Sequence, residues 1–186
     1  MSSGLTVFAG INRAQLPPGS QVAVLGAGGL GHLAIQFLHK MGHAVTALSQ
    51  SPSKQALIGR LGGRFVISEE VAQLTELRGT IDFMLSTLNV PFDLDAHLRL
   101  LKPHGQLCLV AAPNEPLALS GGLLNNSRRA IYGNYIGSRA ETEAMLQFAA
   151  ANGIEGVVEV APLAAVNEAI HRVRTRAVEM CLVLKT

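Results

Sequence analysis

The sequence predicts an α/β protein built on a doubly wound parallel sheet of six strands. Short apolar runs alternate along the chain with segments that carry apolar residues at helical spacing. The apolar runs show little polar alternation, which is typical of strands that are covered by helices on both faces. The 186 residues are 48% apolar and 15% charged, a composition that supports one buried core and excludes a disordered chain.

The elements follow in order from the amino terminus. Residues 5–15 have the spacing of a helix face, and the LPPGS break stops them. Six strands are predicted at 21–26, 43–49, 64–68, 81–88, 106–113 and within 128–137. The connecting helices are predicted before Gly42 and at 53–63, 69–79 and 94–105, the last ending near Pro103, and 120–127 is predicted as a loop. The tail predicts a helix at 141–153, a strand at 157–160, a helix at 163–175 and a strand at 180–185, which extend the sheet or form a neighbouring unit.

Charge and cysteine content exclude several classes of protein. The net charge is +2, and no basic run is longer than Arg128 and Arg129, so a nucleic-acid binder is not expected. Cys108 and Cys181 lie in apolar runs and are predicted to be buried thiols. The chain lacks a signal-like start and an uninterrupted membrane span. We expect a cytoplasmic protein with no membrane partner.

A glycine motif joins the first strand to the helix that follows it. Gly26, Gly28 and Gly31 form G-x-G-x-x-G at a strand-to-helix junction, the context that dinucleotide binding requires. Gly26 permits the tight turn, Gly28 lets backbone N–H groups approach a pyrophosphate, and Gly31 allows close helix packing. The pyrophosphate would rest at the positive end of the helix. The motif therefore predicts a Rossmann fold that binds a dinucleotide.

The end of the second predicted strand bears on which dinucleotide would bind. Domains that prefer NAD place an acid there to hold the ribose 2′-hydroxyl, but this chain has Ser49, Gln50 and Ser51. The serine hydroxyls can donate to a 2′-phosphate, and Lys54 adds a positive charge. The segment favours NADP over NAD, while Ser-Pro-Ser is also compatible with a simple turn and helix cap.

The residues from 16 to 51, LPPGSQVAVLGAGGLGHLAIQFLHKMGHAVTALSQS, resemble the coenzyme domain of zinc-dependent medium-chain alcohol dehydrogenases, in particular the cinnamyl-alcohol-dehydrogenase-like branch that prefers NADP. The likeness continues through LKPHGQLCLVAAPNEPLAL, YIGSRAETEAMLQFAAANGI and VEVAPLAAVNEAIHRVR, and so covers practically the whole chain. It implies an oxidoreductase that transfers hydride between NADP(H) and an alcohol or aldehyde.

The resemblance also implies a set of residues around the cofactor. The backbone at Gly28, Gly29, Leu30 and Gly31 would hold the pyrophosphate, and Ser49, Ser51 and Lys54 the 2′-phosphate. Ser86 and Thr87 would lie near the middle of the cofactor, with strand-end packing as the alternative for Thr87 and also for Tyr135. The nicotinamide would be lined by Ala111, Ala112, Asn134, Tyr135 and Ile136.

The chain also departs from the family it resembles. The family has a preceding catalytic half that holds zinc, and Ser2 stands where its C-A-G-L-T-V stretch has a zinc-ligating cysteine. We therefore expect zinc only in that absent half and no catalytic residue or activity in this chain alone. His32 is the one histidine placed near a ligand, and packing or capping is its favoured interpretation. The position of Met180, which is commonly basic in relatives, lacks a charge.

The expected organisation is a lead-in helix at 1–20, the NADP-binding domain at 21–156 and a return segment at 157–186. Without the catalytic half, the apolar faces of residues 1–15 and 157–186 would lose their cover. A homodimer is expected through the sheet edge near Leu117–Leu119 and residues 131–136. Two alternatives stay open, a stand-alone nucleotide-binding or structural module and a zinc-free quinone-reductase-like oxidoreductase.

Overall fold

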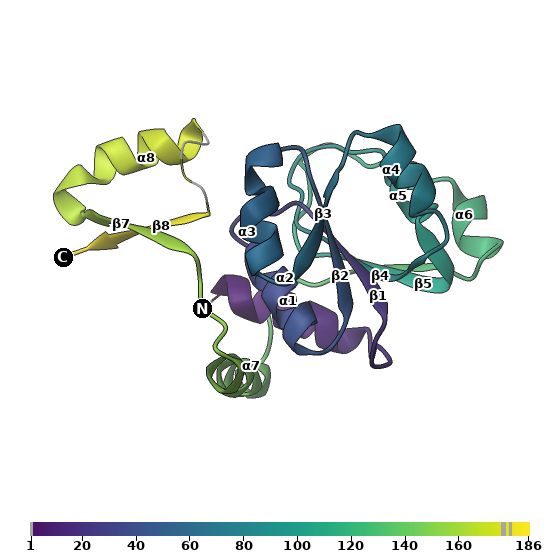
Figure 1. The fold of residues 1–186 in the computed structure, drawn as a ribbon, viewed down its shortest axis with the longest axis horizontal. Helices are drawn as coiled ribbons and strands as arrows, with labels where there is room; N and C mark the ends of the chain where they lie inside the picture. Colours follow the sequence, from purple (N-terminus) through teal and green to yellow (C-terminus); the bar gives the residue numbers. More distant parts are fainter. Residues whose placement is uncertain (1, 176–177, 179) are drawn as a thin grey trace. The chain divides into compact units, whose positions relative to one another are not determined.

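A computed structural model describes residues 2–175, 178 and 180–186 of the chain (Figure 1). The chain divides into two compact units, Met1–Ile154 and Glu155–Thr186. The first unit contains the predicted sheet.

The first unit is built on a six-stranded sheet in which every strand pair is parallel. Its strands are β1 Gln21–Leu25, β2 Ala44–Ser49, β3 Gly63–Ile67, β4 Ile81–Ser86, β5 Leu101–Leu109 and β6 Ala130–Gly133. The strand order is β3-β2-β1-β4-β5-β6, so the direction of winding reverses between β1 and β4. In sheets of this kind, ligands bind outside the carboxyl ends of the strands at that reversal. The predicted fold class is confirmed.

Helices cover both faces of this sheet because alternate strand residues point to opposite sides. Val22 and Val24 belong to a core that includes residues of α1, α2, α3 and α7, whereas Ala23 and Leu25 belong to a second core with α5. Figure 1 shows α4, α5 and α6 together on one side of the sheet. The helices are α1 Ser2–Arg13, α2 Gly31–Lys40, α3 Gln55–Arg60, α4 Val71–Glu76, α5 Leu94–Leu98, α6 Gly121–Asn125 and α7 Arg139–Asn152.

The amino-terminal helix α1 is part of the core of the first unit. Val7 is fully buried, and the Phe8 ring lies 5.3 Å from that of Phe37 on α2 and 5.9 Å from that of Phe148 on α7, centroid to centroid. The expectation that residues 1–15 lose their cover is therefore wrong, because α2 and α7 supply an apolar groove for this helix.

The region around Pro103 differs from the prediction. The helix predicted to end near Pro103 ends at Leu98, and β5 already begins at Leu101. The register between β4 and β5 shifts between Ile81 and Phe83, and His104 has a φ of +64°. Proline has no N–H to donate, and the irregular start of β5 accommodates it within a strand. The helical spacing of the sequence therefore predicts the helix correctly at 94–98 but extends it too far toward Pro103.

Three other boundaries differ from those predicted. The predicted loop at 120–127 contains the short helix α6. Strand β5 ends at Leu109, so Ala111 and Ala112 lie beyond it, and β6 ends at Gly133, before Asn134. Each strand stops where the ladder with its neighbour ends, and that point depends on pairing rather than on local hydrophobicity.

The second unit is small and has a separate two-stranded parallel sheet. It consists of β7 Val158–Pro162, the 3₁₀ turn η2 Leu163–Ala165, α8 Val166–Arg174 and β8 Cys181–Lys185. The tail thus forms a unit of its own and does not extend the six-stranded sheet. Val160 is 63% exposed and Val173 is 56% exposed. No helix in the described part of either unit is both long and apolar enough to cross a bilayer.

Replacing Phe8 with Ala should destabilise the first unit, because it removes a ring that packs between two others. We expect a loss of about 3–5 kcal/mol in the free energy of unfolding, measured by urea denaturation. Val71→Ala is the control, since Val71 is 76% exposed and its truncation should cost less than about 0.5 kcal/mol. Equal effects of the two changes would contradict the burial of α1.

Candidate functional site

The predicted glycine motif forms a tight turn between β1 and α2. Gly26 has a φ of +87°, and its N–H donates to the carbonyl of Leu48 at 2.9 Å. A Cβ on Gly31 would lie 1.9 Å from the carbonyl oxygen of Gly26, whereas a Cβ on Gly28 would meet nothing within 4 Å. The first and third glycines are therefore required by packing, and the second faces open space.

The amino end of α2 opens onto this turn. No side chain caps the helix at Leu30, although the N–H of His32 donates to the carbonyl of Gly28 at 3.0 Å. The first N–H groups of a helix have no partners within it. His32 is 1% exposed, and its Nδ1 lies 3.1 Å from the carbonyl oxygen of Gly28. Burial lowers the pKa of His32, so the ring is neutral near pH 7 and Nδ1–H is the donor. The packing interpretation of His32 is confirmed.

Thr87, just after β4, stabilises the glycine turn from the strand that neighbours β1. Its hydroxyl lies 3.0 Å from the carbonyl oxygens of both Leu25 and Gly26, and its N–H donates to Leu25 at 2.9 Å. Ser86 is fully buried, and its hydroxyl accepts from the N–H of Leu88 at 3.4 Å. Packing at the end of the strand, the alternative interpretation of Thr87, is therefore observed.

The residues predicted to face a 2′-phosphate lie together at the end of β2. Ser49 is buried and its hydroxyl accepts from the N–H of Ser51 at 3.3 Å. The 3₁₀ turn η1 Pro52–Lys54 follows. The ammonium of Lys54 donates to the carbonyl of Ala27 at 2.9 Å, which places its positive charge beside the glycine turn.

The remaining predicted residues follow β5 and β6 at the same edge of the sheet. Asn134 donates from its amide to the carbonyls of Thr6 at 2.9 Å and Ile136 at 3.2 Å, and so ties this loop to α1. Tyr135 is 87% exposed and Ile136 is 55% exposed. Ala111 is half-buried and Ala112 is exposed. All the predicted site residues therefore gather at the carboxyl ends of the strands.

The sequence prediction missed an acidic side chain near the end of β2. Gln50 donates from Nε2 to Oε1 of Glu69, which follows β3, at 2.8 Å. The N–H of Ser68 donates to the carbonyl of Ser49 at 3.2 Å. Glu69 lies 19 positions from Gln50 in the chain, so only the pairing of β2 with β3 reveals their proximity.

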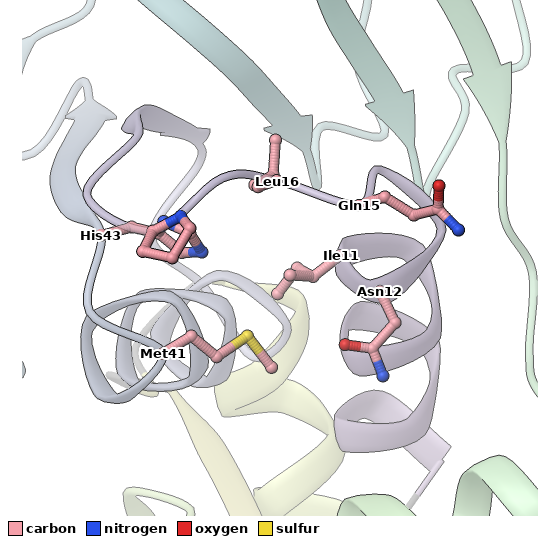
Figure 2. Close-up of a pocket in the computed structure, with 7 residues that line it drawn as sticks. Ile11, Asn12, Gln15, Leu16, Met41 and His43 are labelled. Atoms are coloured by element: carbon pink, nitrogen blue, oxygen red, sulfur yellow. The ribbon is translucent and has the colours of Figure 1, made fainter.

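A separate cavity of about 260 Å³ lies at the opposite, amino-terminal edge of the sheet (Figure 2). It is lined by Ile11, Asn12, Gln15, Leu16, Pro18, Met41 and His43. Nδ1 of His43 is buried and has no hydrogen-bond partner among the described residues. None of the predicted site residues lines this cavity.

The two cysteines differ in exposure. Cys108 is fully buried, and burial raises the pKa of its thiol to about 11, which confirms that it is an inert apolar side chain. Cys181 in β8 is only half-buried, so the prediction of a buried thiol is wrong for this residue, and both thiols are free. Within the described ranges, no group of three or more His, Cys, Asp or Glu side chains gathers in a way that could hold a metal ion.

The fold and this edge define a class of protein, a Rossmann-type α/β domain with a glycine turn at its strand reversal. Residues 29–151 match the model of the zinc-binding dehydrogenase family. This match covers more than half of the chain, and the protein belongs to that family.

Curated relatives and solved structures agree with this assignment. The chain is 40% identical over 174 residues to "Probable formaldehyde dehydrogenase AdhA" of Bacillus subtilis, covering 93% of this chain and 50% of that protein. It is 35% identical over 175 residues to cinnamyl alcohol dehydrogenase 5 of Arabidopsis thaliana, covering 92% and 49%. A cinnamyl alcohol dehydrogenase structure from Sorghum bicolor superimposes with a TM-score of 0.93 at 35% identity, covering 98% and 53%. The chain spans about half the length of these relatives, which are oxidoreductases of the alcohol dehydrogenase type.

Alanine substitutions at Gly31 and Gly28 should differ in their effect on stability, because a side chain is sterically excluded at Gly31 and faces open space at Gly28. Gly31→Ala should reduce the free energy of unfolding by at least about 2 kcal/mol, because the new methyl group meets a backbone carbonyl. Gly28→Ala should cost less than about 0.5 kcal/mol. Thermal and urea denaturation of both variants measure the difference, and a fully stable Gly31→Ala variant would contradict the turn described above.

Proposed function

We propose that this chain binds NADP(H) at the carboxyl edge of the six-stranded sheet, as the coenzyme-binding part of a zinc-type alcohol dehydrogenase or aldehyde reductase. The observation that carries the proposal is the glycine turn, in which Gly31 packs on Gly26 while the space at Gly28 is open. A side chain at Gly28 would fill this space, so the turn fits a group that approaches the backbone closely. The uncapped amino end of α2 supplies N–H donors and a positive dipole for a diphosphate.

The contacts at the end of β2 support the choice of nucleotide. Ser49 and Ser51 carry hydroxyls, and Lys54 holds its ammonium beside the turn through Ala27. Hydrogen-bond donors and a positive charge favour a 2′-phosphate. In domains that prefer NAD, the free ribose 2′-hydroxyl is usually held by an acidic side chain at this place.

The residues after β4, β5 and β6 would position the rest of the cofactor. Thr87, which also holds the glycine turn, would lie near its middle. Ser86 is fully buried, so its contribution would be indirect, through support of the end of β4. The nicotinamide would be lined by Ala111, Ala112, Asn134, Tyr135 and Ile136. The exposed surfaces of Tyr135 and Ile136 are available for such a contact, and Asn134 fixes the path of their loop. A bound nicotinamide dinucleotide supplies the carrier of the hydride.

The length of the relatives supports a division of labour in the whole enzyme. Residues 21–156 would bind the cofactor, 1–20 would lead in from a catalytic half and 157–186 would return to it. A zinc ion and the groups that select the alcohol or aldehyde would belong to that half. The exposed apolar residues of the second unit, such as Val160 and Val173, suit a segment that is covered by another domain.

We also propose that the whole enzyme is a homodimer joined through β6. This strand lies at the edge of the sheet and pairs only with β5 among the described strands. An edge strand presents a row of backbone donors and acceptors for a second copy. Leu119, which precedes α6 and is 44% exposed, would add apolar surface. Two free thiols are in keeping with a reducing, cytoplasmic location.

Titration calorimetry of the purified chain with NADPH and NADH tests the cofactor proposal. We expect both to bind, with NADPH tighter by roughly tenfold, a difference of about 1.4 kcal/mol. Tighter binding of NADH would contradict the choice of nucleotide. No binding of either one would favour a structural module.

Replacing Ser49 with Asp should weaken NADPH selectively. The new carboxylate can still accept from the N–H of Ser51, so the turn is preserved, but its charge repels a 2′-phosphate. We expect the Kd of NADPH to rise at least about tenfold, while NADH binds equally well or better. An unchanged preference, with the fold intact by circular dichroism, would remove Ser49 from the site.

A further inference from the structure

An acidic side chain borders the proposed 2′-phosphate site from the neighbouring strand. Gln50 stands between Ser49 and Ser51, and its amide is turned toward Glu69 rather than toward either serine, with 2.8 Å between Nε2 and Oε1. The backbone ladder extends to the residue before Glu69, because Ser68 donates to Ser49 at 3.2 Å. Glu69 is therefore held at the same edge as the serines.

The charged side chains of Glu70 and Lys54 have hydrogen-bond partners of their own. Glu70, which follows Glu69, has its carboxylate bound by Gln73 of α4 at 2.6 Å, which draws it toward that helix. Lys54 is the cation of the serine segment, and its ammonium is bonded to Ala27 on the glycine turn. Both Gln50 and Glu69 are exposed, so the carboxylate of Glu69 lies at the surface of this edge.

We propose that Glu69, positioned by Gln50, is a specificity-determining residue that reduces the preference of this site for a 2′-phosphorylated nucleotide. The inference rests on the proposed binding of NADP(H). A carboxylate near a dianionic phosphate disfavours it through charge repulsion, whereas a ribose 2′-hydroxyl is neutral and can donate to a carboxylate. Glu69 thus supplies from β3 the acid that β2 lacks, and it moderates the discrimination that Ser49, Ser51 and Lys54 provide.

The test replaces Glu69 with Gln, which removes the charge and keeps the size of an exposed side chain. Glu76→Gln is the matched control, because it also removes one exposed carboxylate but lies on α4 beside Arg64, at the start of β3 and away from the site. NADPH, NADH, adenosine 2′,5′-bisphosphate and 5′-AMP are titrated against all three proteins. We expect E69Q to lower the Kd of NADPH and of the bisphosphate by about threefold to tenfold relative to NADH and 5′-AMP. Glu76→Gln should leave these ratios unchanged.

Salt provides a second readout that a merely structural role would not give. The gain in E69Q should shrink in 1 M salt, where the screening length falls to about 3 Å. If the wild-type chain binds NADPH and E69Q has the same ratios, or if E69Q weakens all four ligands, the role of Glu69 is refuted while the cofactor proposal stands. If the wild-type chain binds none of the four, the proposed function fails and the role of Glu69 fails with it.

Discussion

The site depends on one close contact, the packing of the first residue of α2 against the carbonyl of Gly26. A Cβ at Gly31 would lie 1.9 Å from that oxygen, so only a glycine allows the helix to start so close to β1. The same contact aims the amino end of α2 at the crevice where the winding of the sheet reverses. Thr87 from β4 and His32 from the helix then hold the turn by hydrogen bonds to its carbonyls. Loss of this contact would displace the amino end of α2 and, with it, the backbone around Gly28.

Most of the fold follows from hydrophobic patterning, and the exceptions have tertiary causes. Runs such as that of β1 are continuously apolar because both faces of the strand are covered, and this property is visible in the chain. The prediction of a helix that ends near Pro103 fails because a shift in register between β4 and β5 accommodates this proline within a strand. The position of α1 could not be predicted either, since its cover comes from α2 and from α7, more than a hundred residues away.

The backbone part of the site was predictable, whereas the partners of its side chains were not. The glycine spacing predicts the turn because the turn leaves no room for a side chain at Gly26 and Gly31. The Thr87 hydroxyl, the Lys54 ammonium and the Glu69 carboxylate reach the edge from three different connections, and their partners are 61, 27 and 19 positions away. Such contacts can be predicted only once the strand order and register of the sheet are known. The predicted roles of the site residues in holding a cofactor stay predictions, and their gathering at one edge is what supports them.

The most direct test of cofactor binding at the glycine turn is the chemical shift of individual backbone amides, followed by ¹H–¹⁵N NMR while NADPH is added to the chain. We predict that the amides of Gly28, Gly29, Leu30 and Gly31 shift strongly and saturate together, while that of His43, at the opposite edge of the sheet, does not move. Saturable binding that leaves the four glycine-turn amides unchanged, or that shifts His43 instead, would contradict it.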